Sequence, residues 1–144
     1  MQVSGLLKAK GPSVVTVDLA TTATEIVSVL AEHRIGAVVV SPGGGRMAGI
    51  ISERDIVRAL ADRGVGAMDE PASAIMTTEV FSCHPQTSVE DLMRLMTDRR
   101  IRHVPVLEDD GLVGIVSIGD AVKDRISDLE SETQILHEYI ANGR

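Results

Sequence analysis

Two short polar runs combine residue types that could hold a phosphorylated ligand. They are Ser52-Glu53-Arg54-Asp55 and Ser117-Ile118-Gly119-Asp120, and each follows an apolar stretch and precedes an apolar-periodic one. A serine hydroxyl and the N–H groups of a helix start can donate to phosphate, and Arg54 adds charge-assisted donors. An ionised aspartate only accepts hydrogen bonds, so it suits hydroxyl groups instead. Ser-x-x-Asp is also a capping box, so each run alone leaves open whether it binds a ligand or only begins a helix.

These runs belong to two copies of one longer pattern. With a shift of 65 residues, G-I-I-S-E-R-D-I-V at 49–57 meets G-I-V-S-I-G-D-A-V at 114–122, and five of the nine positions are identical. With a shift of 66, the helix start Thr22-x-x-Glu25 meets Ser88-x-x-Asp91. A cap needs the serine and the acid, but not the preceding glycine and strand. The repeated pattern therefore favours a paired site.

Each copy is expected to fold as β-α-β-β-α. The first has strands near 13–17, 37–40 and 47–51 and a helix over 23–33; the second has strands near 80–83, 104–107 and 112–116 and a helix over 89–99. A second helix ends each copy. Uncharged Val-rich strands indicate sheets covered by helices. A unit of about 60 residues is marginal alone, so the two should pack sheet to sheet with pseudo-two-fold symmetry in an α/β (α+β) fold. The expected divisions are a first repeat at 6–63, a linker at 64–73, a second repeat at 74–126 and a helical extension at 127–144.

Composition excludes several classes of protein. The net charge of −7 and the presence of only one Phe and one Tyr argue against a nucleic-acid binder. Cys83 is the single cysteine, which excludes a disulfide framework, and the histidines lack metal-ligand spacing. Nothing specifies a nucleophile, base and orienting group, so no enzyme is expected. The longest apolar stretch, Ile35 to Val40, is too short to span a bilayer, and the N-terminus lacks the apolar region of a signal peptide. A cytoplasmic location follows as the default.

The tandem pattern, with Gly-apolar-apolar-Ser-x-x-Asp at its last strand-to-helix junction, resembles the CBS domain family, named after cystathionine β-synthase. Ala74-Ile75-Met76-Thr77 and His103-Val104-Pro105-Val106 are further matching marks. The resemblance covers about residues 6–126 and is to small stand-alone bacterial members. It implies a Bateman module, a pair of repeats whose cleft binds AMP, ADP, ATP, NAD(H) or S-adenosylmethionine. It also implies a disc-like dimer that senses its ligand.

The same resemblance implies roles for particular residues. Asp55 and Asp120 would hold ribose, and Ser52 and Ser117 would lie near phosphate, with Arg54 beside the first. The remaining ligand-binding positions, mostly expected near adenine, are Thr16, Val17, Ile35, Gly36 and Ala37 in the first copy and Ser82, Cys83, Arg102, His103, Val104 and Pro105 in the second. Each copy contributes cationic groups, Arg54 in the first and Arg102 and His103 in the second, but from different elements. In a pseudo-symmetric cleft, residues of both copies could therefore converge on one polyphosphate.

Lys10 could also reach a phosphate, but several of the basic and small residues have a simpler alternative to ligand binding. Arg99 and Arg100 suit a solvated helix end, where the dipole favours cations. His103 could be a satisfied, half-buried histidine, Lys10 a surface lysine, and Gly36 a small residue that packs under a helix.

The C-terminal segment indicates a helix to about Ile140. Its apolar residues alternate at spacings of four and three, with Thr133 filling one step: Val122, Ile126, Leu129, Leu136 and Ile140. This is a heptad-like seam. It could pack on its own module or pair with a second copy, and pairing in a homodimer is favoured here.

The sequence therefore predicts a non-catalytic regulatory module that binds an adenosine-containing nucleotide, AMP first and NAD(H) second, as a homodimer. The ligand is not a catalytic cofactor, and no metal, nucleic acid or membrane is involved. The alternative is an adaptor that binds a partner protein and has an empty cleft. A nucleotide hydrolase is a third hypothesis.

Overall fold

The computed structural model describes residues 1–11 and 14–142. The start of the first expected strand, at residue 13, and the last two residues of the C-terminal extension lie outside these ranges. The elements are α1 (Val3–Lys10), β1 (Thr16–Val17), α2 (Ala23–His33), β2 (Ala37–Val40), β3 (Gly49–Ser52), α3 (Glu53–Arg63), the 3-10 helix η1 (Gly64–Asp69), α4 (Ala72–Ile75), α5 (Val89–Arg99), β4 (His103–Glu108), β5 (Gly111–Ser117) and α6 (Ile118–Asn142). The predicted mixed α/β fold with a long C-terminal helix is confirmed.

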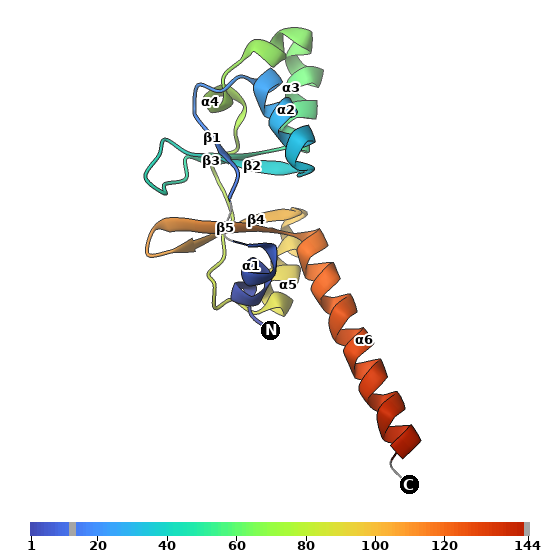
Figure 1. Ribbon diagram of the computed structural model, residues 1–144. Helices are drawn as coiled ribbons and strands as arrows, with labels where there is room; N and C mark the ends of the chain where they lie inside the picture. The colour runs from blue at the N-terminus through green and yellow to red at the C-terminus, as the bar shows by residue number, and fades with distance from the viewer. Residues whose placement is uncertain (12–13, 143–144) are drawn as a thin grey trace.

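Two small sheets face each other in the middle of the molecule, and helices cover their outer faces (Figure 1). In the first sheet β1 runs parallel to β2, and β2 runs antiparallel to β3. The second sheet pairs β4 with β5 antiparallel. The helices α2, α3 and α4 lie over the first sheet, and α1 and α5 lie over the second (Figure 1).

The strand expected at 80–83 is reduced to one isolated bridge, in which Cys83 pairs parallel with Val106. Cys83 N donates to Pro105 O at 3.0 Å, and Leu107 N donates to Cys83 O at 2.9 Å. Pro105 stands where the first copy has Val39, and a proline has no N–H to extend the ladder toward Phe81. The prediction of a full strand was therefore wrong.

The two cores exchange their flanking segments. Val3 and Leu6 of α1 are buried in the core formed by α5, β4, β5 and α6. Ala72 of α4 is buried in the core of the first sheet. Backbone bonds fix both crossings, from Val3 N to Thr87 O at 2.8 Å and from Ala72 N to Thr21 O at 2.7 Å. The chain thus passes twice between the layers and ties the repeats together. The expected linker at 64–73 contains η1 and the first two residues of α4, which extends into the expected second repeat.

Two helices end at an arginine in the left-handed conformation. Arg34 caps α2 and Arg100 caps α5, both in the left-handed conformation with φ of 54°. A left-handed residue at this point ends a helix and redirects the chain into the following strand. At the end of α5 this turn places the segment 99–103 beside the start of α3.

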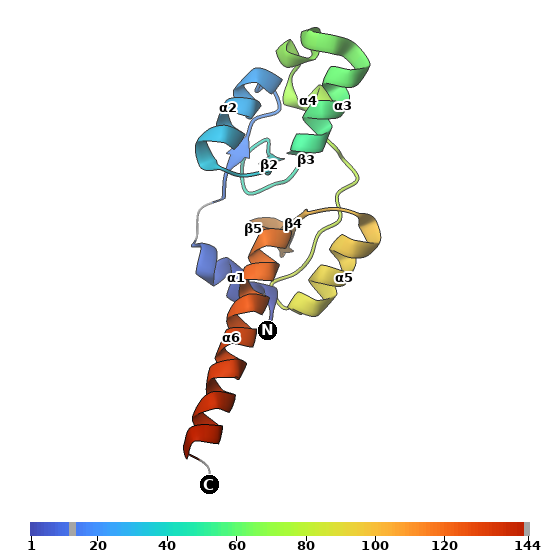
Figure 2. The same cartoon turned by 90° about the vertical axis from the view of Figure 1, so that its right-hand side faces the viewer.

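The helix α6 leaves the body and points away from it, as both views show (Figures 1 and 2). Ala121 in its second turn is buried, whereas every residue from Arg125 to Asn142 is exposed. The alternative that this segment packs on its own module is therefore wrong. Within the described ranges, no helix is apolar and long enough to cross a membrane.

Candidate functional site

Both Ser-x-x-Asp runs form reciprocal capping boxes. At the start of α3, Ser52 N donates to Asp55 Oδ2 at 2.8 Å, and Asp55 N donates to Ser52 Oγ at 3.4 Å. At the start of α6, Ser117 N donates to Asp120 Oδ2 at 2.8 Å, and Asp120 N donates to Ser117 Oγ at 3.1 Å. The two junctions are therefore equivalent in backbone geometry.

The carboxylate of Asp55 has further hydrogen-bond donors. Ser52 Oγ donates to its Oδ2 at 3.0 Å, and Thr77 Oγ1 donates to its Oδ1 at 2.9 Å. With Ser52 N, three of about four acceptor positions of the carboxylate are filled. A ligand hydroxyl that binds Asp55 must therefore take the place of one of these two protein hydroxyls, or use the remaining position.

A cavity of about 260 Å³ opens at this first junction. It brings together five of the predicted site residues, Ser52, Arg54, Asp55, Arg102 and His103. The first three come from the first repeat and the last two from the second. The expectation that both copies converge at one place thus has a geometric basis at this junction.

The cavity is strongly basic. Its lining carries two carboxylates and five guanidinium groups: Asp55 and Glu79, with Arg54, Arg58, Arg99, Arg100 and Arg102. In a chain with a net charge of −7, this concentration of cations stands out against the overall charge. Clefts lined by one sign of charge attract ligands of the opposite sign.

Two of these arginines are held by contacts across the cavity. Arg54 Nη1 donates to Arg100 O at 3.2 Å, which joins the start of α3 to the end of α5. The Arg99 guanidinium lies over the Phe81 ring, 4.6 Å from its centroid. Glu53 N already donates to Gly36 O at 3.0 Å and Asp55 N to Ser52 Oγ, so the Arg54 N–H is the group at this helix start that can meet an anion.

Sequence reasoning missed several residues of this lining: Ile50, Arg58, Thr77, Glu79, Val80, Phe81 and Ile101. Arg58 carried a signal, because it follows Arg54 by one helical turn and shares its face. The segment 77–81 carried no such signal in the sequence. It was grouped with the second repeat, whereas it lines the cavity at the first junction. Thr77 in fact pairs with Ile50 of β3 by two backbone bonds, at 3.0 and 2.9 Å.

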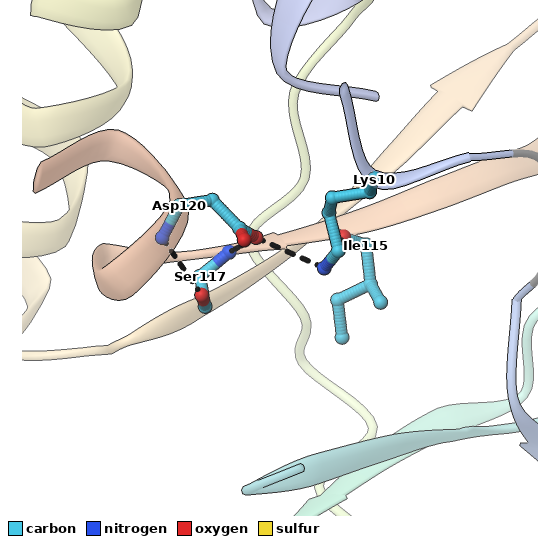
Figure 3. A network of polar contacts seen from close by, with 4 residues as sticks. All are labelled: Lys10, Ile115, Ser117 and Asp120. Carbon is cyan, nitrogen blue, oxygen red and sulfur yellow. Dashed lines mark hydrogen bonds and ion pairs between the residues drawn. The ribbon is translucent and has the colours of Figure 1, made fainter. Parts of the chain in front are cut away.

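The second junction is occupied by a lysine from the N-terminal segment (Figure 3). Lys10 Nζ lies 2.9 Å from Asp120 Oδ2 and donates to Ile115 O at 2.8 Å. Both side chains are about one-third exposed or less. Lys10 is thus more than a surface lysine, because it pairs with the aspartate that is equivalent to Asp55.

His103 lies between the two junctions. A Cβ atom built on Gly36 would come within 2.9 Å of the His103 ring and 2.8 Å of Glu53 Oε1, so these three residues meet closely. Burial, and next the Arg102 cation, hold the pKa of His103 below its ordinary value, while Glu53 acts in the opposite direction. Lys10 lowers this pKa and Asp120 raises it, both more weakly. A side chain at position 36 would require the His103 ring or the Glu53 carboxylate to move.

The other predicted site residues are dispersed outside the cavity at the first junction. Val17, Ala37, Val104 and Pro105 are buried, so only their backbone could meet a ligand. Thr16 and Ser82 are exposed, and Ile35 is half-buried. Cys83 is also half-buried, and burial raises its pKa to about 11, which keeps the thiol protonated.

The fold and the site define a module of two related α/β repeats that meet at paired strand-to-helix junctions. The family model for the CBS domain matches residues 11–62 and 72–126, and the chain belongs to this family. The CBS domain-containing protein CBSX3 of Arabidopsis thaliana, described as mitochondrial, is 39% identical over 151 residues, covering 98% of this chain and 72% of that protein. The crystal structure of the CBS-domain containing protein ATU1752 from Agrobacterium tumefaciens is 43% identical, with a TM-score of 0.83 over 87% of this chain and 99% of that one.

Two further relatives were solved with ligands. The CBS domain protein PAE2072 from Pyrobaculum aerophilum, in complex with AMP, is 32% identical with a TM-score of 0.72, covering 83% of this chain and 89% of that one. The CBS domain pair of protein MJ0100, in complex with 5′-methylthioadenosine and S-adenosyl-L-methionine, is 27% identical with a TM-score of 0.76, covering 85% and 98%. CBS pairs similar to this chain thus bind adenosine-containing ligands.

Proposed function

We propose that this protein is a non-catalytic sensor that binds an adenine nucleotide, AMP first and NAD(H) second, at the junction between β3 and α3. The observation that carries the proposal is the cavity beside Ser52, Arg54 and Asp55, where five guanidinium groups meet a helix start. Relatives solved with AMP, 5′-methylthioadenosine and S-adenosyl-L-methionine support the adenosine class. A cavity of about 260 Å³ lies near the lower end for ligand pockets, which favours a mononucleotide over a dinucleotide.

Each part of AMP has a matching group in this arrangement. The phosphate would accept from the Arg54 N–H and from the guanidinium groups of Arg54 and Arg58. The ribose hydroxyls would donate to Asp55, displacing Ser52 Oγ or Thr77 Oγ1. The base would lie against the apolar lining near Val80.

The second junction would be a weaker site of the same kind. Its predicted residues are Ser117 and Asp120. A ribose that binds Asp120 must compete with Lys10, and no arginine follows Ser117 as Arg54 follows Ser52. We propose that this site fills only at higher ligand concentration.

The test is a calorimetric titration of the whole chain with AMP, ADP, ATP, NAD(H) and S-adenosylmethionine, with adenosine and inorganic phosphate as controls. AMP should bind more tightly than either of its parts. It should also raise the melting temperature, because a ligand that binds only the native state stabilises it. Absence of binding by all five at millimolar concentration would overturn the proposal and favour the adaptor alternative.

Asp55 provides a test at the level of the residue. Asp55→Ala should weaken AMP binding, and Asp120→Ala should weaken only the second binding event. Unchanged affinity in both single variants and in the double variant would reject the ribose assignment. Turnover of any nucleotide in the same samples would contradict the non-catalytic role.

A further inference from the structure

We infer that the exposed part of α6 pairs with the same helix of a second copy as a parallel, in-register coiled coil. The starting observation is an apolar stripe that is largely exposed to solvent. Five of its side chains are between 42% and 64% exposed: Val122, Ile126, Leu129, Leu136 and Ile140. The helix α6 extends well beyond the body (Figure 2), and every residue from Arg125 to Asn142 is exposed.

The side-chain types on this stripe suit a two-stranded parallel pair. In a heptad written abcdefg, the a positions are Ile126, Thr133 and Ile140, and all three are β-branched. Two of the d positions, 129 and 136, are leucine. β-Branched residues at a with leucine at d favour parallel dimers. The Thr133 hydroxyl donates to Leu129 O at 2.9 Å within its own helix, so its methyl group is available for the seam.

Charges at the edges of the stripe favour the parallel direction. In a parallel pair, each g residue faces the e residue five positions later on the other helix. Arg125 at g then faces Glu130 of the partner subunit, and Glu132 at g faces His137 of the partner subunit, which can donate to a carboxylate. In an antiparallel pair centred on the same seam, Glu130 would face Glu130 of the partner subunit, and Glu132 would face its own copy. Like charges at these positions oppose that arrangement.

The length of the helix sets the expected strength. The exposed segment from Arg125 to Asn142 has 18 residues and so is about 27 Å long. Fewer than three heptads make a marginal coiled coil alone. The pairing is therefore expected to be reversible and to depend on protein concentration, and it needs a measurement that traps the pair.

Disulfide trapping tests the direction of the pair in the full chain. In a Cys83→Ser background, Leu136→Cys places a thiol at a d position, and Gln134→Cys places one on the outer face as a matched control. In a parallel pair the two Leu136→Cys thiols face each other and should cross-link under mild oxidation at least about tenfold faster than the control. The product should have twice the 15.3 kDa mass of one chain. Equal rates for the two variants would overturn the proposal.

A charge exchange tests the register independently. Arg125→Glu and Glu130→Arg each turn two attractive contacts of the dimer into repulsive ones. Each should weaken dimerisation by about fourfold or more in sedimentation equilibrium. The double exchange should restore the wild-type dissociation constant if the pair is parallel and in register. Failure of the double exchange to restore the dissociation constant would contradict the proposal, and so would a chain that is monomeric at 1 mM. Circular dichroism of each variant serves as the control for an intact helix.

Discussion

The two strand-to-helix junctions share their backbone geometry but not their electrostatics. Each has a capping box in which the serine N–H donates to the aspartate at 2.8 Å. Of the five arginines around the first junction, four have no arginine at the repeat-related position; the counterparts are Gly119 for Arg54, Lys123 for Arg58, His33 for Arg99 and Gly36 for Arg102. The repeat therefore specifies the backbone of two sites, while individual side chains determine which site attracts an anion.

The pairing partners of the two aspartates show the same difference. Asp55 accepts from the neutral hydroxyl of Thr77, which a ribose hydroxyl can replace with little electrostatic cost. Asp120 is paired with the charged Lys10, and a neutral hydroxyl is a poorer replacement for a cation. Four experiments test whether these side chains make the two junctions different.

The largest effect is expected from removing the cation that is present only at the first junction. Arg54→Ala should weaken AMP binding by between about tenfold and a hundredfold, because a hydrogen bond to a charged group is lost at the phosphate. Arg94→Ala is the matched control, since Arg94 is exposed on α5 and forms an ion pair with Asp91, three residues earlier on the same helix. The measurement is calorimetric titration of both variants. A similar change in both would show that general charge, rather than the position of Arg54, governs binding.

Adding a cation to the second junction should have the opposite effect. Gly119 is exposed, and a Cβ atom there would meet only Ser117 Oγ, at 3.5 Å. Gly119→Arg should therefore fold normally and tighten the second AMP binding event by about tenfold. Gly119→Ala controls for the added helix propensity. If the arginine variant binds like the alanine variant, the absence of Arg54 is not what separates the two junctions.

Removing the Lys10 charge should lower the stability of the protein but strengthen AMP binding at the second junction. Lys10→Met keeps most of the apolar stem but not the ion pair with Asp120, and should lower the free energy of unfolding by about 0.5 kcal/mol. The same variant should tighten AMP binding at the second junction, because Asp120 no longer has a competing cation. Urea unfolding and titration measure the two effects. Increased stability, or weaker binding at the second junction, would contradict the role assigned to Lys10.

The smallest effect concerns His103, which lies between the two junctions and has Ala37 at the repeat-related position. Its pKa is lowered in the folded protein by burial and by Arg102, so the folded state favours the neutral ring. The resulting stability is fully present above the unfolded pKa of about 6.5 and is lost as pH falls through the lower folded pKa. His103→Gln should flatten the decline of the melting temperature between pH 7 and acidic pH. An unchanged pH profile would show that the His103 ring is not held neutral by the fold.

Much of the fold could be predicted because it depends on local patterns. The helices over 23–33 and 89–99 agree with the structure, since a capping serine or threonine and an apolar stripe define each one. The exchange of α1 and α4 between the repeats could not be predicted, because an apolar face such as that of Val3 and Leu6 does not itself specify which core it joins. Local patterns do not encode which layer a flanking segment will join.

The candidate site was predictable to a similar degree. Ser52, Arg54 and Asp55 stood out because the Gly-apolar-apolar-Ser-x-x-Asp motif recurs, and Arg102 and His103 because they are basic and lack counterparts. Their convergence depends on the face-to-face packing of the two sheets, which brings the end of α5 to the start of α3. The pairing of Lys10 with Asp120 depends on the path of α1 and had no signal in the sequence.

The central claim is that an adenine nucleotide places its phosphate at the first junction. A crystal structure of the full chain grown with AMP, at a concentration that fills one site per chain, tests it most directly. We expect the phosphate to lie within hydrogen-bonding distance of the Arg54 N–H and guanidinium, and a ribose hydroxyl to donate to the Asp55 carboxylate. AMP bound first at Ser117 and Asp120, or outside both junctions, would contradict it.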